Sequence, residues 1–451
     1  MKTPVPPPAP LSDMWKILIE RGTEPQRLLQ VLTTPGLADD PEYHEWEWFF
    51  RHEPPAGFTR EEWWYAVRSA RASNARALPL ALKDGAPLTF TLPDSFLRLN
   101  DWITSRACGR IEVPEPVANP TTRNRYLVSS LIEEAMTSSR LEGAATSRVD
   151  AKRMLRERRE PTDRSEQMIL NNFLAMQKIV ELKDEPLTPE LIMRIHHRVT
   201  SKTLDDPSEA GRIQRPGEPR VRVVGDLGEN QILHLPPSAD ELPARMEALC
   251  AFANATDAEA GTYVPPLVRA IALHFMMRYD HYFVDGNGRT ARAVFYWSML
   301  NQGFFLAEFL SISRLLLHAP AQYSRSFLHT EQDEGDLTYF LLAQARIIQK
   351  AIVDLDAYLE RKTLELKSVG AKLRKSGLNH RQIALLEVFA RDPGATTTVQ
   401  EHQRTHGVSL QTARNDLNGL EERGFIDFAK RGKTFVWFPD DDLAERIEAG
   451  E

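Results

Sequence analysis

The residues best suited to chemistry in this chain lie in twelve consecutive positions, His281 to Arg292. Gly286 and Gly288 allow backbone torsions that aim successive N–H groups at one point. We expect a helix to begin inside the segment, and the N-terminus of a helix favours a phosphate group. Arg289 and Arg292 are three residues apart, so they share one face of that helix. Two guanidinium groups beside a cradle of amides predict a site for a polyphosphate.

Two further side chains add chemistry to such a site. Asp285 lies at the edge of the cradle, where one carboxylate and phosphate oxygens can together hold Mg²⁺. His281 lies at the mouth of the loop, and the usual pKa of an imidazole suits a general base. A zinc site built from His274, His281 and Asp285 is an alternative, but it leaves the two arginines without a role. The segment therefore favours a phosphate site that carries a metal ligand and a base.

The elements around this segment must be helices for the cradle to form. Before the segment, apolar residues recur at helical spacing at Val268, Ile271, Ala272 and Phe275. A second set with this spacing starts inside the segment and continues past it, at Ala291, Val294, Phe295 and Met299. The glycines and Ala291 also have the spacing of a dinucleotide-binding fingerprint, which requires a preceding strand. Because the preceding pattern is helical, we reject that interpretation.

The segment resembles the motif of the Fic (filamentation induced by cAMP) family, H-x-F-x-D/E-G-N-G-R-x-x-R, at every fixed position. A weaker resemblance extends over about residues 121–365 and implies a helical core with a β-hairpin flap. Two positions depart from the commonest form of the motif. Asp280 stands where an apolar residue is usual, and Tyr282 stands where proline is usual. Neither is a functional position of the motif, although Asp280 could raise the basicity of His281.

The resemblance implies transfer of AMP from ATP to a Ser, Thr or Tyr hydroxyl of a target protein. By position, His281 would deprotonate that hydroxyl, and Asp285 would hold Mg²⁺ between the α- and β-phosphates. Phe283 would anchor the loop in the core. Such a transfer depends mainly on positioning and charge neutralisation, which these residue types provide. The main-chain amides of the loop and the Asn287 side chain would surround the α- and β-phosphates, and the two arginines would hold the β- and γ-phosphates. The residues expected at the nucleotide are Asp285, Gly286, Asn287, Gly288, Arg289, Thr290, Ala291 and Arg292.

Residues 220–237 alternate polar and apolar side chains around a glycine turn, which predicts a β-hairpin. By resemblance this hairpin would be the flap of the family, and its strand edge would hold a target segment by strand addition. The alternative is an ordinary surface hairpin. In the flap role, Val224 and Gly225 would approach the nucleotide. Tyr323 lies where the family often has tyrosines that contact adenine or ribose, although Gln322 replaces the other half of the usual pair.

A second segment, upstream of the core, combines a serine, a glutamate and a glycine. Ser138 and Glu142 are four residues apart on one helical face, and Gly143 is a helix-end signal. A glutamate near a helix end is usually solvated, but beside a Fic motif this segment resembles the inhibitory motif S/T-x-x-x-E-G/N, on a helix of about residues 124–143. The resemblance implies that Glu142 pairs with Arg292 in the space of the γ-phosphate and keeps the chain weakly active. In some members the same glutamate supports AMP removal, so deAMPylation stays open.

The chain is long enough for about three domains, with 451 residues. Its 42% hydrophobic and 26% charged residues are typical of globular proteins. We expect a mainly α protein. It would comprise an N-terminal helical domain at 1–114 with six of the eight tryptophans, the Fic catalytic domain at 121–365, and a small C-terminal domain at 376–440. Helices are expected at Asp13–Leu32 and Arg60–Ala77 of the first domain.

Residues 376–440 have a pattern of their own, which resembles the winged helix-turn-helix domain of bacterial regulators. A helix is followed by a helix–turn–helix and by two strands with a basic tip. The residues that would contact DNA are Gln411, Thr412, Arg414, Asn415, Arg431 and Lys433. The charge of this region favours DNA binding only weakly, because residues 376–438 contain eight basic and seven acidic side chains. Winged helices also bind proteins, so both partners stay open.

Composition also indicates a compartment and partners. The net charge is −7, so the chain as a whole does not favour nucleic acid. Cys108 and Cys250 lie far apart, as in proteins of a reducing compartment, and no segment is apolar enough to cross a membrane. These features predict a cytoplasmic protein. The resemblance to the Fic family implies a self-inhibited protein adenylyltransferase whose partners are ATP and a protein target, with DNA bound through the winged helix and a second copy in a homodimer as further expected partners. The rivals are a DNA-binding regulator that senses a nucleotide in the same pocket, and transfer of another nucleotide or phosphate group.

Overall fold

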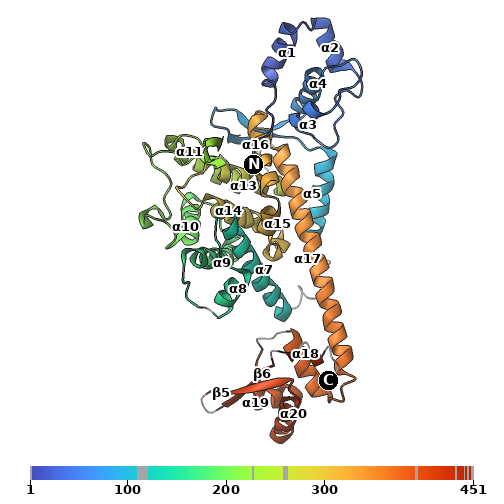
Figure 1. Ribbon diagram of the computed structural model, residues 1–451, viewed down its shortest axis with the longest axis vertical. Coiled ribbons are helices and arrows are strands. Elements are labelled where there is room, and N and C mark those ends of the chain that lie inside the picture. The colour runs from blue at the N-terminus through green and yellow to red at the C-terminus, as the bar shows by residue number, and fades with distance from the viewer. Residues whose placement is uncertain are drawn as a thin grey trace. The chain divides into compact units, whose positions relative to one another are not determined.

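The computed structural model is mainly helical, with three short two-stranded sheets among the residues it describes (Figure 1). It describes the chain except residues 1–2, 109–119, 158, 226–227, 257–262, 392–394, 432–433, 441, 444–445 and 448–451. The chain forms two compact units. Unit 1 contains residues 1–112 and 127–352, and unit 2 contains residues 113–126 and 353–451. Within the described residues, no helix is both long and apolar enough to span a bilayer.

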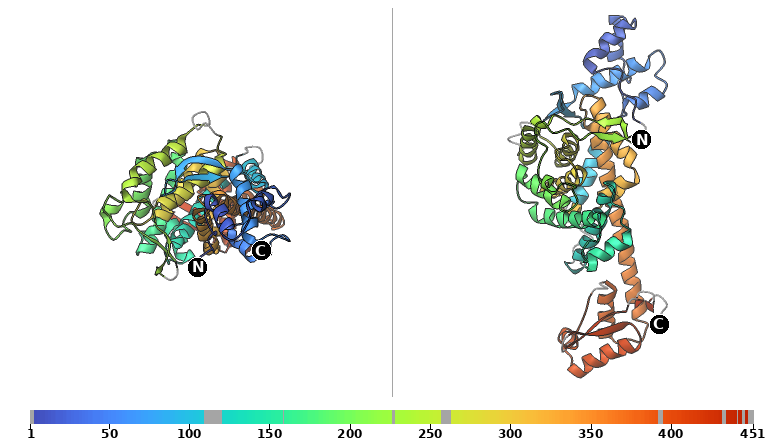
Figure 2. Two further views of the ribbon diagram at one scale, coloured as in Figure 1. Left: turned by 90° about the horizontal axis from the view of Figure 1, so that it is seen from above. Right: turned by 60° about the vertical axis from the view of Figure 1, so that its left-hand side comes forward.

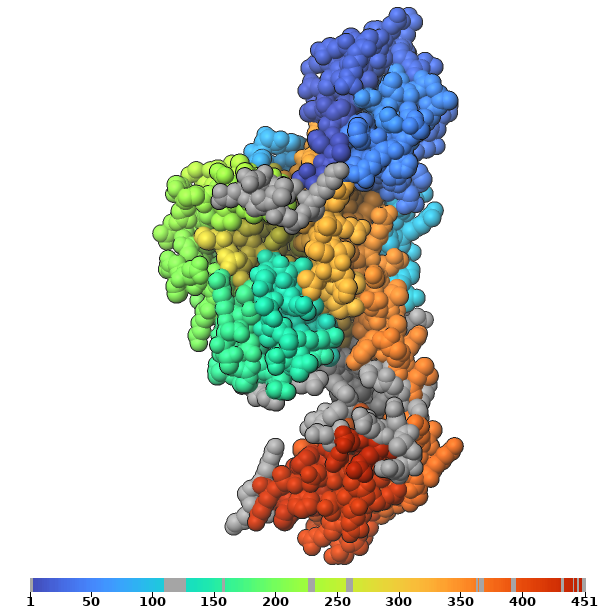
Figure 3. Space-filling view, in the orientation of Figure 1, coloured from blue at the N-terminus to red at the C-terminus, as the bar shows by residue number. Residues whose placement is uncertain are grey.

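The centre of unit 1 is the antiparallel pair of helices α13 (Pro266–Asp280) and α14 (Asn287–Asn301), between which the motif loop turns. Almost every side chain of both helices is buried, and little of them reaches the face shown in Figure 3. A helix that is buried all round requires other helices on every side. They are α9 (Arg164–Leu182), α10 (Pro189–Thr200), α11 (Leu242–Asn254), α15 (Ile312–His318), α16 (Pro320–Gln332) and the first part of α17 (Thr338–Leu373) (Figure 2).

Helix α7 (Pro120–Leu141) ends beside this centre and leads through a turn into α8 (Arg148–Glu157). One face of α7 packs with α8 and α9 in a small apolar cluster. The buried carboxylate of Glu134 also anchors α7, because it accepts hydrogen bonds from the Ser313 amide at 3.0 Å and from the Ser311 and Ser313 hydroxyls. The end of α7 is therefore fixed relative to the motif.

The stretch 220–237 contains an antiparallel hairpin of β3 (Val223–Gly225) and β4 (Gly228–His234), with two irregularities in its register. Its turn at 226–227 lies outside the described residues. Val224 and Ile232 are about half exposed, so the apolar side chains of this hairpin are not all used in the core. The hairpin lies within the range that the alternating pattern predicts.

Residues 1–112 pack onto the central helices instead of forming a compact unit of their own. They form α1 (Leu11–Glu20), α2 (Pro25–Thr33), α3 (Trp46–Arg51), α4 (Arg60–Ser73), a hairpin of β1 (Arg76–Ala81) and β2 (Pro87–Phe90), and α5 (Asp94–Ala107). The single helix expected at Asp13–Leu32 is wrong, because Gly22 has φ 93° and Pro25 starts a second helix. The helix expected at Arg60–Ala77 ends at Ser73, and Ala77 lies in β1. A separate N-terminal domain at 1–114 stays a prediction.

Buried ion pairs hold this N-terminal segment on α16 and α17. The Arg68 guanidinium, 8% exposed, lies 2.8 Å from Asp333 Oδ1 and 3.6 Å from Asp336 Oδ2. The hydroxyl of Tyr43 donates to Asp336 at 2.7 Å. Main-chain bonds join Thr89 of β2 to the turn before α17. These contacts explain why residues 1–112 belong to the same compact unit as the core.

Unit 2 contains the end of α17, then α18 (His380–Arg391), α19 (Val399–His406), α20 (Leu410–Glu422) and a hairpin of β5 (Ile426–Arg431) and β6 (Thr434–Pro439). The order of these elements is the one expected from the sequence. Thr398 and Ser409 cap the second and third helices through their hydroxyl groups. An apolar core joins all of them, including Leu373, Leu386, Leu417, Phe425 and Trp437.

Candidate functional site

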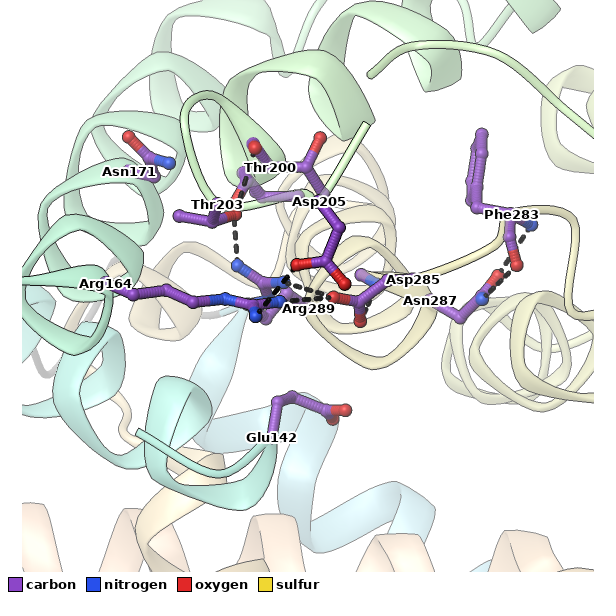
Figure 4. A network of polar contacts seen from close by, with 12 residues as sticks. Glu142, Arg164, Asn171, Thr200, Thr203, Asp205, Phe283, Asp285, Asn287 and Arg289 are labelled. Atoms are coloured by element: carbon purple, nitrogen blue, oxygen red, sulfur yellow. Dashed lines mark hydrogen bonds and ion pairs between the residues drawn. The ribbon is translucent and has the colours of Figure 1, made fainter. Parts of the chain in front are cut away.

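The motif loop begins where α13 ends. His281 follows the helix in the left-handed region, with φ 50° and ψ 57°, which is uncommon for a residue with a side chain. Phe283 is fully buried, and its ring stacks on His196 with centroids 3.7 Å apart. The loop then closes on itself, since the Asn287 amide accepts from Phe283 N at 2.9 Å and donates to Phe283 O at 2.7 Å (Figure 4). The Asn287 side chain thus holds the loop closed. The main-chain N–H of Asn287 takes no part in these two bonds and remains available to a phosphate.

The imidazole of His281 is 9% exposed, and no partner contacts its Nδ1. Burial and, to a smaller extent, the positive charges of Arg278 and Arg220 lower the pKa of His281 to about 3. The ring is therefore neutral at physiological pH, which is the state that a general base requires. A bound polyphosphate would raise this pKa, because nearby negative charge stabilises the imidazolium.

The cradle forms at the N-terminus of α14. Gly286, with φ 80°, caps the helix, and a Cβ at this position would lie 2.4 Å from Thr200 Cγ2. Only glycine combines that torsion with such a close approach. Thr290 donates its hydroxyl back to Gly286 O at 2.9 Å, and Ala291 is fully buried under the turn. These contacts leave the first amides of α14 facing the site.

Arg289 is buried at one edge of the cradle, and its Nη1 donates to Val199 O at 2.7 Å (Figure 4). Its Nη2 lies 3.9 Å from Asp285 Oδ2. The side chain of Asp285 is 45% exposed, and it also lies 3.5 Å from Arg164 Nη2. The Arg289 Nε, by contrast, is buried without a partner. This edge therefore combines an accessible carboxylate with a guanidinium whose hydrogen bonds are incomplete.

Glu142 lies directly on the cradle. A Cβ built on Gly288 would be 1.8 Å from Glu142 Oε1 and 2.7 Å from Arg278 Nη1. The carboxylate pairs with Arg292 at 3.0 Å and with Arg278 at 3.8 Å. Burial opposes ionisation of Glu142, but Arg292 and Arg278 outweigh burial, so the pKa of this carboxyl lies below its usual value. A negative group therefore occupies the position that the cradle offers to an anion.

The end of α7 aims Glu142 at that position. Gly143 has φ 95°, its N–H donates to Arg140 O, and Ala144 N donates to Ser139 O. This is the Schellman arrangement, and it makes Glu142 the C-cap. Ser138, one turn earlier, accepts from Arg292 Nε through its hydroxyl and from Nη2 through its carbonyl, both at 2.8 Å. The structure thus brings the upstream segment onto the motif helix.

Comparison with known proteins shows what the region around this site is similar to. Residues 186–299 match the model described as Fic/DOC family. The chain carries a Fic/DOC domain. The range contains α10, the hairpin and the motif, whereas α7 with Glu142 precedes it.

Curated relatives of the Fic/DOC domain are each named protein adenylyltransferase Fic. The protein of Nematostella vectensis is 28% identical over 182 residues, which are 40% of this chain and 36% of the relative. The protein of Drosophila mojavensis is 28% identical over 192 residues, which are 42% of this chain and 31% of the relative. The aligned part is thus about a third of the length of these relatives. A solved Fic family protein from Desulfovibrio desulfuricans G20 shares the fold, with a TM-score of 0.51 and 18% identity over 78% of this chain and 97% of the other.

Two residues of the Fic/DOC domain that sequence reasoning missed support the loop. Gly211 N donates to His196 Nδ1 at 2.9 Å, so His196 Nε2 carries the proton and donates to Asp285 O at 2.9 Å. Burial lowers the pKa of His196 to about 4, which keeps this tautomer neutral. Arg278 is the other missed residue, because it adds a cation beside Glu142 and His281. Its position three residues before His281, on the last turn of a helix, was the available signal.

The two departures from the usual Fic motif contact each other. The Tyr282 hydroxyl donates to Asp280 Oδ2 at 2.7 Å, and Arg245 Nε lies 2.7 Å from Asp280 Oδ1. Arg245 also donates to Ala81 O at the end of β1. The carboxylate of Asp280 is thus paired with Arg245 and Tyr282. The idea that Asp280 raises the basicity of His281 gains no support from these contacts.

Tyr323 is buried, and its hydroxyl lies 2.9 Å from His274 Nε2. Its ring packs against Phe327 and Phe340. The hydroxyl is therefore engaged inside the core, and a contact with adenine or ribose stays a prediction. Val224 is exposed on β3, next to Gly225, and the approach of these two residues to the nucleotide stays a prediction. Among the described residues, no three His, Cys, Asp or Glu side chains gather as a metal site.

Of the residues expected to contact DNA, Gln411, Arg414 and Asn415 are exposed on α20, and Thr412 is half-buried. Gln411 donates to Asn415 Oδ1 at 2.9 Å, and the Thr412 main-chain N–H donates to the capping hydroxyl of Ser409 at 3.1 Å. The side chain of Arg431 and the whole of Lys433 lie outside the described residues. The outer face of α20 is thus polar and accessible.

Proposed function

We propose that this chain is a protein adenylyltransferase that transfers AMP from ATP to a hydroxyl of a target protein and is inhibited by its own Glu142. The observation that carries the proposal is the position of the Glu142 carboxylate, which lies against Gly288 and pairs with Arg292. That site is built for negative charge, because a helix N-terminus and two cations converge on it. The names of the relatives and the Fic/DOC domain support the same activity.

In the proposed reaction the target hydroxyl attacks the α-phosphorus of ATP, its proton passes to His281, and pyrophosphate leaves. His281 is neutral and has a free Nδ1, as this role requires. The main-chain amides of residues 286–288 would hold the α/β-phosphates, and Arg289 with Arg292 would neutralise the leaving group. Arg278 would add a third positive charge in the same place.

The accessible carboxylate of Asp285 fits Mg²⁺. This ion keeps several waters and usually takes only one or two carboxylates besides phosphate oxygens, so a single exposed aspartate beside a phosphate cradle suits it. Asp285 would hold the ion, with its other carboxylate oxygen already accepting from Gly286 N. When bound, Mg²⁺ would neutralise charge on the phosphates. Arg164, now 3.5 Å from Asp285, would have to release the carboxylate.

Inhibition follows from competition for the same cations. With Glu142 in place, the γ-phosphate of ATP would face a carboxylate paired with Arg292 and Arg278. Nucleotide could then bind only in a displaced position, and transfer would be slow. Removal of AMP from a modified protein is the alternative activity of this arrangement, since it uses the same pocket with Glu142 present.

The test is the intact mass of three purified forms after incubation with ATP and Mg²⁺: wild type, Glu142→Gly, and Glu142→Gly with His281→Ala. We expect a gain of one AMP in the Glu142→Gly form and little or none in the other two. Equal, slow modification of wild type and Glu142→Gly would overturn the inhibitory role. No modification of any form, nor of added cell proteins, would favour a nucleotide-sensing regulator instead.

We also propose that residues 376–440 act as a winged helix that binds DNA. The exposed polar face of α20 supports this, as does the hairpin that follows it. The prediction is that Arg414→Ala weakens binding of duplex DNA by about tenfold, because one base or phosphate contact is worth about 1–3 kcal/mol. Fluorescence anisotropy at fixed salt, with and without ATP, measures the affinity. Arg404→Ala, a charge-matched change on α19, is the control, and equal effects of the two would indicate only unspecific attraction.

A cytoplasmic location and a homodimer belong to the same proposal. The sequence features that suggest the location are the two cysteines, which lie far apart and form no disulfide. Sedimentation of the purified chain with and without ATP would measure the oligomeric state.

A further inference from the structure

One guanidinium group joins the flap region to the residue expected to be the base. Arg220 Nη2 donates to Asp280 O at 2.6 Å and to His281 O at 3.0 Å. Its Nε donates to Pro237 O at 2.7 Å, and its Nη1 donates to the side chain of Gln214. Arg220 and Pro237 flank the hairpin β3–β4 on its two sides. A single side chain therefore ties both ends of the hairpin to the carbonyls around His281.

Neighbouring residues of the same region bind the adjacent carbonyls. Gln214 N donates to Tyr282 O at 2.9 Å, and its side chain donates to Pro219 O at 2.9 Å. His234, at the end of β4, places Nε2 2.7 Å from Tyr279 O. Four consecutive carbonyls, from 279 to 282, are thus contacted by donors between residues 214 and 234. The last carbonyls of a helix have no partner within it, so these donors complete the end of α13.

The backbone of His281 needs such support. Its left-handed torsions are unfavourable for a residue with a Cβ, and they persist only where the surroundings fix them. Without donors on the carbonyls of 280–282, the chain could relax toward an ordinary helix end. The imidazole would then point elsewhere, and a displacement of about 1 Å at a reacting group can cost about a hundredfold in rate.

We propose that Arg220 is a positioning residue that couples the flap hairpin to His281. The same side chain would then fix both the position of the hairpin, which holds the target segment, and the direction of the His281 imidazole. The inference rests on the proposed AMP transfer. A target segment that binds the edge of the hairpin would shift or steady the Arg220 guanidinium, which also donates to the His281 carbonyl. Arg220 touches no reacting atom in this role. It acts through the backbone carbonyls of residues 280 and 281, in addition to the effect of its charge on the pKa of His281.

The experiment uses the full-length chain with Glu142→Gly as parent and adds Arg220→Ala, Arg220→Lys or Gln214→Ala. Arg215→Ala is the matched control, because Arg215 is an exposed arginine of the same segment that makes no contact with residues 280–282. Steady-state AMP transfer gives kcat and the KM for ATP. Hydrogen exchange of the segment 279–286 gives its local stability without any need for activity.

We expect Arg220→Ala to lower kcat about 10- to 100-fold with the KM for ATP changed less than threefold, and to speed exchange in 279–286. Arg220→Lys should rescue only in part, because an ammonium group cannot serve the carbonyls of 237, 280 and 281 in the fixed geometry of a guanidinium. Gln214→Ala should act in the same direction and more weakly. Its effect should vanish in the Arg220→Ala background, since the two side chains form one contact network.

Several results would overturn the inference. One is a kcat of Arg220→Ala within twofold of the parent with unchanged exchange in 279–286. Another is an equal loss of kcat in Arg215→Ala, which would mean that the positive charge of this region matters and not the contacts of Arg220. A third is a raised KM for the target protein with kcat unchanged, which would confine Arg220 to target binding. If the parent itself transfers no AMP, the proposed function fails, whereas the exchange data still test the contact between Arg220 and the His281 backbone.

Discussion

At the residue scale, the site is unusual for the number of cations around one carboxylate. Glu142 contacts Arg292 and Arg278, and its charge also stabilises Arg289. Removing Glu142 leaves these guanidinium groups close together without a counter-charge, so an anion should bind more tightly there. The glutamate therefore stabilises the empty site and competes with its ligand, which is the physical basis of the proposed inhibition.

Stability should depend on pH through the buried imidazoles. The folded pKa of His281 is about 3 and that of His196 about 4, both below the value of about 6.5 expected in an unfolded chain. Below pH 6.5 the unfolded chain therefore binds protons that the folded chain does not. We expect the free energy of unfolding to fall as pH decreases from 6.5 toward 4, by up to about 1.4 kcal/mol per pH unit for each group.

Urea unfolding followed by tryptophan fluorescence at pH 7 and pH 5 measures this dependence. His281→Asn should reduce the difference between the two pH values, because it removes one of the two groups. His197→Asn, an exposed histidine of the same helix α10 as His196, is the control and should leave the difference unchanged. The same pH dependence in all three proteins would contradict the assignment to His281.

At the scale of elements, the end of α7 decides where the inhibitory carboxylate lies. The Schellman turn at Gly143 fixes the direction of Glu142, and Ser138 holds the far side of Arg292. Glu134 anchors the helix through the serines before and within α15, and burial raises its pKa. The helix is therefore attached at two points about two turns apart. Release of the proposed inhibition would require the loss of the contacts at the end of the helix only.

Ser138→Ala should weaken the inhibition without abolishing it. The change removes one hydrogen bond to Arg292 Nε, worth about 1 kcal/mol, so AMP transfer should rise about fivefold above wild type and stay below that of Glu142→Gly. Ser139→Ala is the matched control, because the hydroxyl of Ser139 is buried without a partner. Time courses of AMP incorporation measure both. Equal rates in the two variants would show that the Ser138 hydroxyl does not hold the inhibited state.

At the scale of the whole molecule, residues 1–112 share a core with the Fic/DOC domain. The link runs through Arg68, Asp333 and Asp336 at one place and through Arg245, which joins β1 to Asp280, at another. Burial raises the pKa of Asp333 to about 6 despite the nearby arginine. These groups are charged and buried, so each depends on its partner. The N-terminal segment therefore supports the helix that carries His281.

Arg68→Ala should destabilise unit 1 by about 3–5 kcal/mol, because it leaves two buried carboxylates without their cation. Thermal unfolding followed by calorimetry measures the effect on the melting temperature. Arg60→Ala on the same helix is the control, since its partner Glu53 is exposed and a surface ion pair contributes about 0–1 kcal/mol. Similar melting temperatures for the two variants would show that the buried cluster does not hold the segment in place.

The sequence by itself determined the motif loop, the helices on both sides of it, the hairpin before it and the order of elements in unit 2. These features depend on local chemistry: glycine torsions, helical spacing of apolar residues, and capping side chains next to the groups they cap. The position of Glu142 at the end of a helix is also local, but its proposed role follows only from the resemblance of its segment to a known motif.

Only the tertiary structure decided which distant groups meet. His196 and Arg220 have no local pattern that marks them, because their partners are main-chain carbonyls far along the chain. The place of Arg278 on the last turn before His281 is a local signal, but it does not show that Glu142 lies against it. The pairing of Tyr282 with Asp280, the burial of Tyr323 on His274, and the shared core of residues 1–112 belong to the same class. Such contacts depend on how whole helices pack, and helical periodicity shows which face is buried but not what lies against it.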